Sequence, residues 1–316
     1  MRFHLCNVEP QGYAWGHFLD DFCRLVCYSL ETLGHTCTMG CNQIEPERIN
    51  IIFGGHTLGT VEHVDTIAGS CQYIALQHEI LNPDGINLSR NQQHFEQVYL
   101  PFLRRSLAVW EGIPRNLAPL QKLGIKTAFF RGGYHPAMEE VRPKLERDID
   151  FLFYGSITPY RRAMLERLSE RGHLVIAVFD SRATYRNDLI GRAKVNLAPV
   201  QGPGMEHFAY GRVCYLLNNQ SLVVVQRCED QSWLDACFIP AAEYDWVDVC
   251  EQTLLRPDRD ALQKENCARF RRIPFTEQIQ RLLESTFSHD SSAYHALATS
   301  GGLGHDPTVQ AIAQTG

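Results

Sequence analysis

The feature that most constrains this chain is a repeated alternation of short apolar runs with stretches that carry apolar residues at helical spacing. In the first 134 residues the runs expected to form strands are MRFHLCNV, RINIIFGG, QYIALQHE, SLAVWEG and KTAFFRGGY, and helices are expected over 20–33, 91–106 and 113–124. Strands that alternate with helices indicate a parallel sheet covered by helices on both faces. In such a sheet the loops after the carboxyl ends of the strands form the ligand site.

The alternation stops at one polar segment and then starts again. The charge-dense stretch AMEEVRPKLERDID predicts a linker, and the runs DIDFLFYGS, HLVIAVF, KVNLAPV and SLVVVQ follow it. A chain of 316 residues is also longer than one hydrophobic core usually supports. We therefore expect two Rossmann-like α/β domains, residues 1–140 and 141–287 with late helices in the second. A flexible tail rich in Ser, Gly, Ala and Thr is expected over 288–316.

Composition narrows the class of protein. The net charge of -6 and the absence of basic runs argue against a protein that binds nucleic-acid phosphates or an anionic membrane surface. The first residues lack the apolar core of a signal peptide, and no stretch has the length of a membrane helix, so a cytoplasmic protein without a membrane span is expected. The eleven cysteines mostly lie among apolar neighbours, which favours buried thiols, although Cys23 with Cys27 or Cys37 with Cys41 could contribute to a metal or redox site.

The stretch FLFYGSITPYRRAMLERL combines a buried strand, a turn and a helix start. Gly155 permits a sharp turn, Ser156 supplies a hydroxyl, and Arg161 and Arg162 open the helix. Free amides at a helix start bind anions, and an arginine adds charge-assisted hydrogen bonds. The stretch is compatible with a diphosphate site, and equally with a plain turn whose arginines are solvated.

A second stretch, NLAPVQGPGMEHFAYGRVCYLLNNQSLVVVQ, brings a glycine-rich loop before a helix. Glu206 and His207 begin that helix, Arg212 lies in it, and Gln226 ends the next strand. A loop, a helix start and a strand end that converge suit a nucleotide and its sugar. Glu206 has a second interpretation, as an acid favoured by the helix dipole.

The catalytic candidates lie on loops of the first domain. An imidazole can act as a general base near neutral pH, and His17 on the loop after the first strand supplies one. The same histidine could simply belong to the first turn of the following helix. His56 and His78 are alternative bases, and Glu79 is a second catalytic candidate.

These stretches together resemble a known family. The order DIDFLFYGS, RR, NLAPV, GRVCYLL and SLVVVQ is similar to the carboxyl-terminal half of bacterial GT-B glycosyltransferases, close to a group of small cytoplasmic enzymes with an FYGS…RR motif. Upstream, YIALQHE, AVWEGIPRNLAPLQKLGI and RGGYHPAME resemble further segments of that group. The resemblance covers about residues 73–255.

The resemblance implies two Rossmann-like domains facing each other across a cleft, with a nucleotide sugar held mainly by the second domain and the acceptor by the first. The co-substrate would be UDP-, GDP- or dTDP-linked, the acceptor a small molecule, peptide or glycan, and neither a cofactor nor a metal would be needed. The implied donor-binding residues are Gly155, Ser156, Arg161, Arg162 and Arg212; Glu79 and Asn116 would face the acceptor side.

The chain departs from the family pattern at two positions. Gln226 stands where the family tends to carry a glutamate, and Ala209 stands where an acid often precedes the helix arginine. Glutamine can hydrogen-bond a hydroxyl but brings no charge. A GT-B-like subunit that binds nucleotide sugar without turnover is therefore the alternative, and a sugar-nucleotide epimerase is a third reading.

Overall fold

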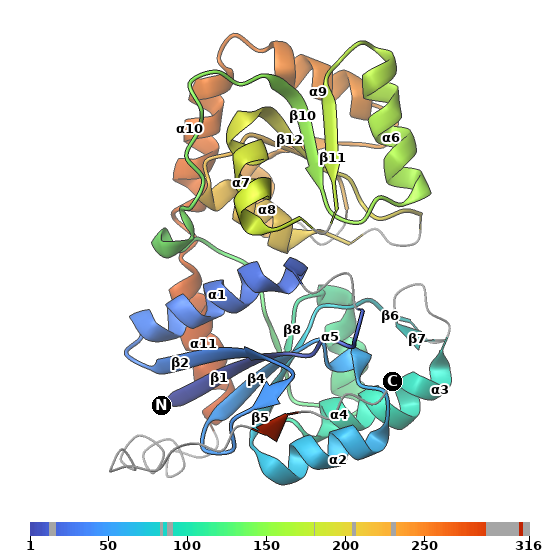
Figure 1. The fold of residues 1–316 in the computed structure, drawn as a ribbon, viewed down its shortest axis with the longest axis vertical. Helices are drawn as coiled ribbons and strands as arrows, with labels where there is room; N and C mark the ends of the chain where they lie inside the picture. The colour runs from blue at the N-terminus through green and yellow to red at the C-terminus, as the bar shows by residue number, and fades with distance from the viewer. Residues whose placement is uncertain are drawn as a thin grey trace. The chain divides into compact units, whose positions relative to one another are not determined.

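The computed structural model divides the chain into two compact units. Unit 1 contains residues 1–131 and the residues from 276 onward, and unit 2 contains residues 132–275. Figure 1 shows the ribbon of both units. The structure describes residues 1–12, 17–82, 85–86, 91–179, 181–203, 207–228, 232–288 and 310–311.

Unit 1 is built on a six-stranded parallel sheet with the order β2-β1-β4-β5-β8-β9. Its strands are β1 (Arg2–Asn7), β2 (Thr36–Cys41), β4 (Ile49–Phe53), β5 (Tyr73–Gln77), β8 (Val109–Glu111) and β9 (Thr127–Phe129). Two short antiparallel pairs accompany it: β3 (Gln43–Ile44) with β15 (Gln310–Ala311), and β6 (Leu81–Asn82) with β7 (Gly85–Ile86).

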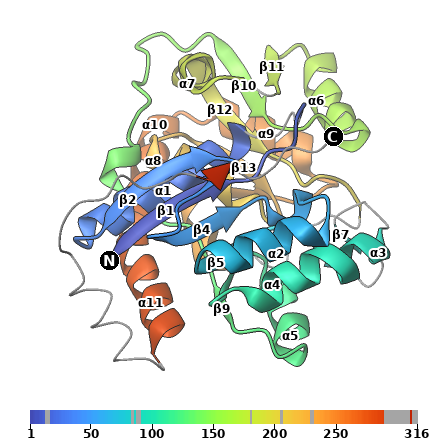
Figure 2. The same ribbon diagram turned by 60° about the horizontal axis from the view of Figure 1, so that its bottom comes forward.

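Helices cover the sheet of unit 1 because successive side chains of its strands point to opposite faces. The helices are α1 (His17–Thr32), η1 (Gly55–Thr57), α2 (Val61–Ser70), α3 (Gln92–His94), the π-helical η2 (Phe95–Tyr99), α4 (Leu100–Arg105), α5 (Pro114–Lys122) and α11 (Phe275–Phe287). On one face, buried Ile52 and Ala75 of the sheet share a core with Ile67 of α2 and Phe102 of α4. Figure 2 shows α2 and α4 side by side, in agreement with their contacts.

Unit 2 is a five-stranded parallel sheet with the order β11-β10-β12-β13-β14. Its strands are β10 (Ile149–Tyr154), β11 (Val175–Val178), β12 (Ala193–Ala198), β13 (Val223–Gln226) and β14 (Ile239–Ala241). Its helices are η3 (Pro136–Met138), α6 (Pro159–Glu170), α7 (Ala183–Arg192), α8 (Tyr210–Asn218), η4 (Ser232–Cys237), α9 (Trp246–Leu255) and α10 (Arg259–Phe270). Phe151 and Phe153, two residues apart, face the core formed with Leu165 of α6 and Trp246 of α9. Helices α7 and α8 contact the sheet as well.

The last helix differs from the sequence prediction, which placed residues up to 287 in the second domain. From Thr276 onward α11 belongs to unit 1. The helix makes polar contacts with β8, β9 and the residue before β9. Trp110 Nε1 donates to Thr286 Oγ1 (3.0 Å) and Lys126 Nζ donates to Thr286 O (2.7 Å). Gln278 Nε2 donates to Phe129 O (2.9 Å). Contacts between residues more than a hundred positions apart leave no periodic signal in the sequence.

The chain segments that enter and leave unit 2 are paired with each other. Tyr134 N donates to Ile273 O and Phe275 N donates to Tyr134 O, both at 2.8 Å, and a parallel bridge joins Tyr134 to Pro274. Unit 2 is therefore an insertion whose two ends lie together. No helix in the described part of the chain is long and apolar enough to cross a bilayer.

Candidate functional site

The strand order of unit 2 locates its ligand site. The chain places β11 on one side of β10, and β12, β13 and β14 on the other, so the connections reverse direction between β10 and β12. In parallel α/β sheets ligands bind outside the carboxyl ends of the strands at such a point. The residues that follow β10 and β12 and the last residue of β13 therefore form the candidate donor site.

Gly155 follows β10 and lies against an arginine. Its φ of +134° is a conformation that other residues rarely adopt, and a Cβ at this position would collide with Nη2 of Arg212. The absence of a side chain at Gly155 thus creates the space that the guanidinium occupies. The sequence prediction that placed Gly155 and Arg212 in one site agrees with this contact.

Arg212 is a buried cation in the first turn of α8. Its residue exposure is 5%, and its guanidinium lies over the rings of Phe153 (4.8 Å to the centroid) and Tyr154 (5.6 Å). Nε and Nη1 have no hydrogen-bond partner among the described residues. Burial lowers the pKa of Arg212 to about 10, and nearby Tyr154 opposes that shift. A buried cation whose N–H groups lack hydrogen-bond partners destabilises the free protein, and such a group suits an anionic ligand.

Arg161 lies close to Arg212 but has other partners. Its Nε donates to Pro199 O (3.2 Å) and Val200 O (3.1 Å), and its Nη1 donates to Ser156 O (2.9 Å). Burial, followed by the charge of Arg212, holds the pKa of Arg161 well below its usual range. Arg161 therefore joins the loop after β10 to the loop after β12 and adds a second positive charge.

The remaining residues of the predicted donor site differ in exposure. Ser156 is half-buried and its carbonyl accepts from Arg161, whereas Arg162 is exposed. His207 is half-buried in the segment before α8. Glu206 lies outside the described residues.

Gln226 closes the site at the end of β13. It is 5% exposed, its Oε1 accepts from Val200 N (3.1 Å), and its Nε2 donates to the hydroxyl of Tyr160 (2.6 Å). Both ends of the amide thus hold protein groups. Tyr160, in the first turn of α6, was not singled out by the sequence, because its partner is 66 positions away.

The carboxyl edge of the sheet in unit 1 carries an acid–base cluster. His56 lies in η1 after β4, and His78 and Glu79 follow β5. Glu79 Oε1 lies 3.6 Å from His56 Nε2 and 3.4 Å from His78 Nε2, with the three side chains 9 to 16% exposed. The structure therefore brings His56 to Glu79 and His78, which the sequence placed on another loop. The side chain of the other candidate, His17, lies outside the described residues; His17 is the first residue of α1.

Three buried side chains hold the Glu79 loop. Gln77 Oε1 accepts from Glu79 N (2.8 Å), and Gln77 Nε2 and Asn116 Nδ2 donate to Glu79 O (2.6 and 2.8 Å). Both amides also donate to Glu111, at 3.2 Å from Gln77 and 3.3 Å from Asn116. Gln77 and Glu111 were not predicted, although a polar residue at the end of an apolar strand run is a signal for both positions. Asn116, expected to face the acceptor, is instead 1% exposed.

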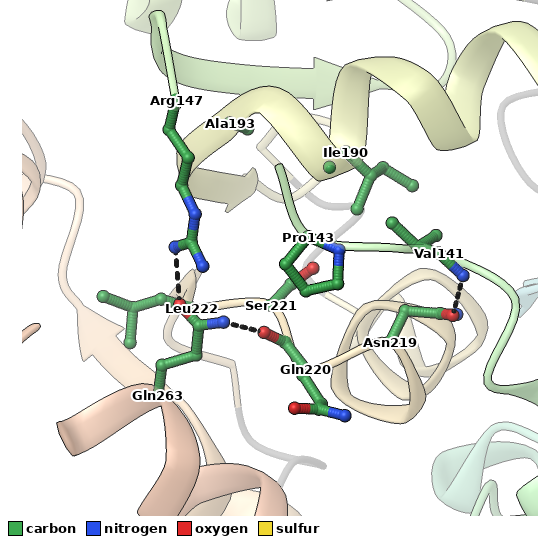
Figure 3. A pocket seen from close by; sticks show the side chains of 11 residues that line it. Val141, Pro143, Arg147, Ile190, Ala193, Asn219, Gln220, Ser221, Leu222 and Gln263 are labelled. Atoms are coloured by element: carbon green, nitrogen blue, oxygen red, sulfur yellow. Dashed lines mark hydrogen bonds between the residues drawn. The ribbon is translucent and has the colours of Figure 1, made fainter. Parts of the chain in front are cut away.

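A small hollow lies at the opposite edge of unit 2. Figure 3 shows it beside Ala193, the first residue of β12, with Arg147 donating to Gln263, Gln263 donating to the carbonyl of Gln220, and Val141 N donating to Asn219. It has room for roughly one water molecule. Its size and its place at the amino ends of the strands separate it from the candidate donor site.

The cysteines form no cluster of a known type. All eleven are free thiols. Within the described ranges, no group of three or more His, Cys, Asp or Glu side chains has the arrangement of a metal site.

Comparison with known proteins identifies the fold. No protein-family model matches the sequence, and no curated protein matches it significantly. Among solved structures, AviGT4, a glycosyltransferase involved in avilamycin A biosynthesis, has a TM-score of 0.55 at 14% identity over 95% of this chain and 99% of its own. The α,α-trehalose 6-phosphate synthase from Burkholderia multivorans has a TM-score of 0.54 at 14% identity, over 90% of this chain and 78% of its own. A UDP-forming α,α-trehalose-phosphate synthase from Burkholderia vietnamiensis gives 0.54 at 14% identity, over 90% and 79%.

Many of the structural neighbours are glycosyltransferases. At this level of identity the likeness establishes the fold alone. The chain has the α/β fold of GT-B glycosyltransferases, with two Rossmann-like units, as expected from the sequence.

Proposed function

We propose that this protein is a glycosyltransferase that moves a sugar from a nucleotide-sugar donor to an acceptor hydroxyl. The observation that carries the proposal is Arg212 at the switch point of unit 2. Its guanidinium is buried, and its Nε and Nη1 have no hydrogen-bond partner among the described residues. In this proposal unit 2 binds the donor and unit 1 supplies the acid–base residues. The structural neighbours, among them a glycosyltransferase and a UDP-forming trehalose-phosphate synthase, support the choice of reaction class.

The charge of the candidate donor site suits a diphosphate. Arg161 and Arg212 both lie over the ring of Phe153, at 5.3 and 4.8 Å, and neither forms an ion pair with a described residue. A diphosphate would neutralise this charge and use the free donors of Arg212. Helix α8 starts without a side-chain cap at Ala209, so its first amides suit the same anion.

The proposed role of Arg212 in the reaction follows from where charge develops. When the bond between the sugar and the diphosphate breaks, negative charge grows on the leaving oxygen, and a preorganised cation stabilises that state more than the ground state. In this scheme Arg161 is a positioning residue, because its donors hold the two loops. Arginine and the helix start take the part that a metal ion would otherwise play.

The acid–base cluster of unit 1 suits the acceptor step. An imidazole of His56 or His78 would accept the proton of the acceptor hydroxyl as the new bond forms, and the carboxylate of Glu79 would orient that ring and stabilise its charged form. His17 remains a third proposed base.

Gln226 favours a second candidate function, a subunit that binds nucleotide sugars without transferring them. Both polar ends of this side chain already bond to the protein, to Val200 and Tyr160, and it brings no charge to the donor. In this alternative Arg212 would still bind the diphosphate. The two candidates therefore differ in turnover and not in binding.

One set of measurements tests the proposal. Calorimetric titration with UDP, GDP and dTDP, each compared with its own monophosphate, should show binding of one diphosphate and a loss of at least about tenfold in affinity for the corresponding monophosphate. The matching nucleotide sugar should then be consumed, with a glycosylated product on an acceptor panel. Tight binding with intact donor after prolonged incubation would select the inactive subunit, and equal affinity for the diphosphate and its monophosphate would refute the diphosphate site.

A further inference from the structure

We propose that Glu111 is a positioning residue that, through Gln77 and Asn116, fixes the place of Glu79 against His56 and His78. The inference rests on the proposed function, since that function gives the Glu79 cluster its acid–base role. It adds a residue that never touches the substrate but decides the geometry of those that do.

The first link is the backbone of residue 79, which is held from both sides. Gln77 accepts from Glu79 N at 2.8 Å and donates to Glu79 O at 2.6 Å, and Asn116 donates to the same carbonyl at 2.8 Å. Two side-chain amides thus replace the regular ladder where β5 ends. The position of the Glu79 main chain depends on which end of each amide faces it.

The second link is the carboxyl of Glu111, which sets the orientation of both amides. Its Oε2 accepts from Gln77 Nε2 at 3.2 Å, and its Oε1 accepts from Asn116 Nδ2 at 3.3 Å and from Ile113 N at 2.8 Å. An amide has nearly the same shape when flipped, so shape alone does not choose its orientation. When it is ionised, the carboxyl offers lone pairs on both oxygens, and only the observed orientation turns an N–H toward each of them. The test is therefore made above pH 8, where Glu111 is ionised.

A flipped Gln77 would repel the loop. Its oxygen would face Glu79 O and its nitrogen would face Glu79 N, so both bonds to residue 79 would be lost. The hydroxyl of Tyr99 donates to Gln77 Oε1 at 3.0 Å and supports the same orientation. Glu111 itself is fully buried, so its hydrogen bonds reach the cluster through these amides.

The third link is the distance between Glu79 and the histidines. One oxygen, Glu79 Oε1, serves both rings at 3.6 and 3.4 Å. Proton transfer requires the partners within hydrogen-bond reach, and a displacement of about 1 Å can cost up to ~100-fold in rate. The backbone clamp is therefore expected to affect turnover more than donor binding.

The test is Glu111→Gln, which keeps the volume but replaces one acceptor oxygen with an NH₂ donor that faces Gln77 or Asn116. In protein with ¹³C-labelled histidine, the ring C–H signals of His56 and His78 are assigned with His56→Gln and His78→Gln. Glu79→Gln then defines how both signals move when the carboxylate is neutralised. We expect Glu111→Gln to move both histidine signals in the direction in which Glu79→Gln moves them. The expected size is at least about a third of the Glu79→Gln shift.

The matched control is Glu45→Gln, another change of a buried carboxyl to an amide in unit 1. The carboxyl of Glu45 contacts His4, Thr38 and Arg48. It should leave the His56 and His78 signals in place. A folded Glu111→Gln protein with unmoved signals would overturn the proposal. If Glu111→Gln does not fold, Asn116→Ala removes the second amide and must give the same movement.

Turnover separates this proposal from the proposed function. With the nucleotide sugar that the wild type consumes, Glu111→Gln should lower kcat about 10- to 100-fold and leave KM for the donor within about twofold. A raised KM with unchanged kcat would contradict positioning. If the wild type transfers no sugar, the proposed function fails, while the histidine signals still decide whether Glu111 positions Glu79.

Discussion

The two units place opposite chemistry at the same edge of the same kind of sheet. In unit 1 the two carboxyl groups at the carboxyl edge have partners within the unit: Glu79 lies between two imidazoles, and Glu111 accepts from two amides and a backbone N–H. In unit 2, Arg161 and Arg212 lie close together without a described carboxylate partner. The carboxylates of the first edge have partners in the free protein, whereas the arginines of the second would gain theirs from the anion that we propose.

The sharpest test of this difference is Arg212→Met. Removal of an uncompensated buried charge should raise the free energy of unfolding of the ligand-free protein by about 1 kcal/mol or more. The same change should weaken binding of the nucleoside diphosphate by about 3 kcal/mol, roughly 100-fold or more. Urea unfolding and calorimetric titration measure the two effects. If Arg212→Met lowers both the free energy of unfolding and the affinity for the diphosphate, Arg212 is a structural residue and the contrast between the edges fails.

Gly155→Ala should give the next largest effect. The added Cβ collides with the Arg212 guanidinium, and the alanine must also adopt a φ of +134°. We therefore expect a loss of about 2–4 kcal/mol in the free energy of unfolding. Gly172→Ala is the control, because Gly172 also has a positive φ, +88°, but open space where the Cβ would lie. That control should lose only about 1 kcal/mol. Equal losses would mean that the contact with Arg212 has no energetic weight.

The buried carboxyl of unit 1 predicts a pH dependence of stability. Burial raises the pKa of Glu111 from 4.5 to about 8, against three hydrogen bonds that lower it. Between these values the folded chain keeps a proton that the unfolded chain has released, so stability is full below the unfolded pKa and falls as the pH rises toward 8. The slope from this group is at most about 1.4 kcal/mol per pH unit.

Glu111→Gln removes that slope. Urea unfolding at several pH values between 5 and 8 should show the wild type losing stability relative to the variant by about 1 kcal/mol or more as the pH rises. The nearest ionisable groups that act on Glu111 are Tyr99 and Glu79. A constant difference between the two proteins across this range would contradict the raised pKa.

The smallest effect is expected for Arg162→Ala. Arg162 is exposed beside the buried Arg161, and exposed cations contribute at most about 1 kcal/mol to binding an anion. We expect the affinity for the nucleoside diphosphate to change by less than about threefold in calorimetric titration. A loss comparable to that of Arg212→Met would move the diphosphate to the exposed face of α6.

Much of the fold is readable from the sequence because buried parallel strands are apolar runs. The predicted runs contain strands β1, β4, β5, β8, β9, β10, β11 and β13, and all of β12 except its first residue. Strand β2 was missed because Thr36–Cys41 is largely half-exposed at the sheet edge and reads as polar. Strand β14 has only three residues, and α2 was missed as well.

The candidate site is less readable, because it depends on sheet register. The family resemblance placed Gly155 and Arg212 in one site, and the structure puts these two residues in contact. The pairing of Gln77 with Glu111 arises where β5 lies beside β8, and these residues are register partners. Two loops are joined by Arg161 across 38 and 39 positions. Neighbours made by the sheet have no spacing that a single sequence can reveal.

The return of α11 to unit 1 has a consequence for biosynthesis. The first 131 residues emerge early from the ribosome. Trp110 and Lys126 cannot bond to Thr286 until nearly the whole described chain has been made. Unit 2 emerges in between as one continuous segment with paired ends. The inserted half can therefore fold during translation, while the half that begins first is the last to be finished.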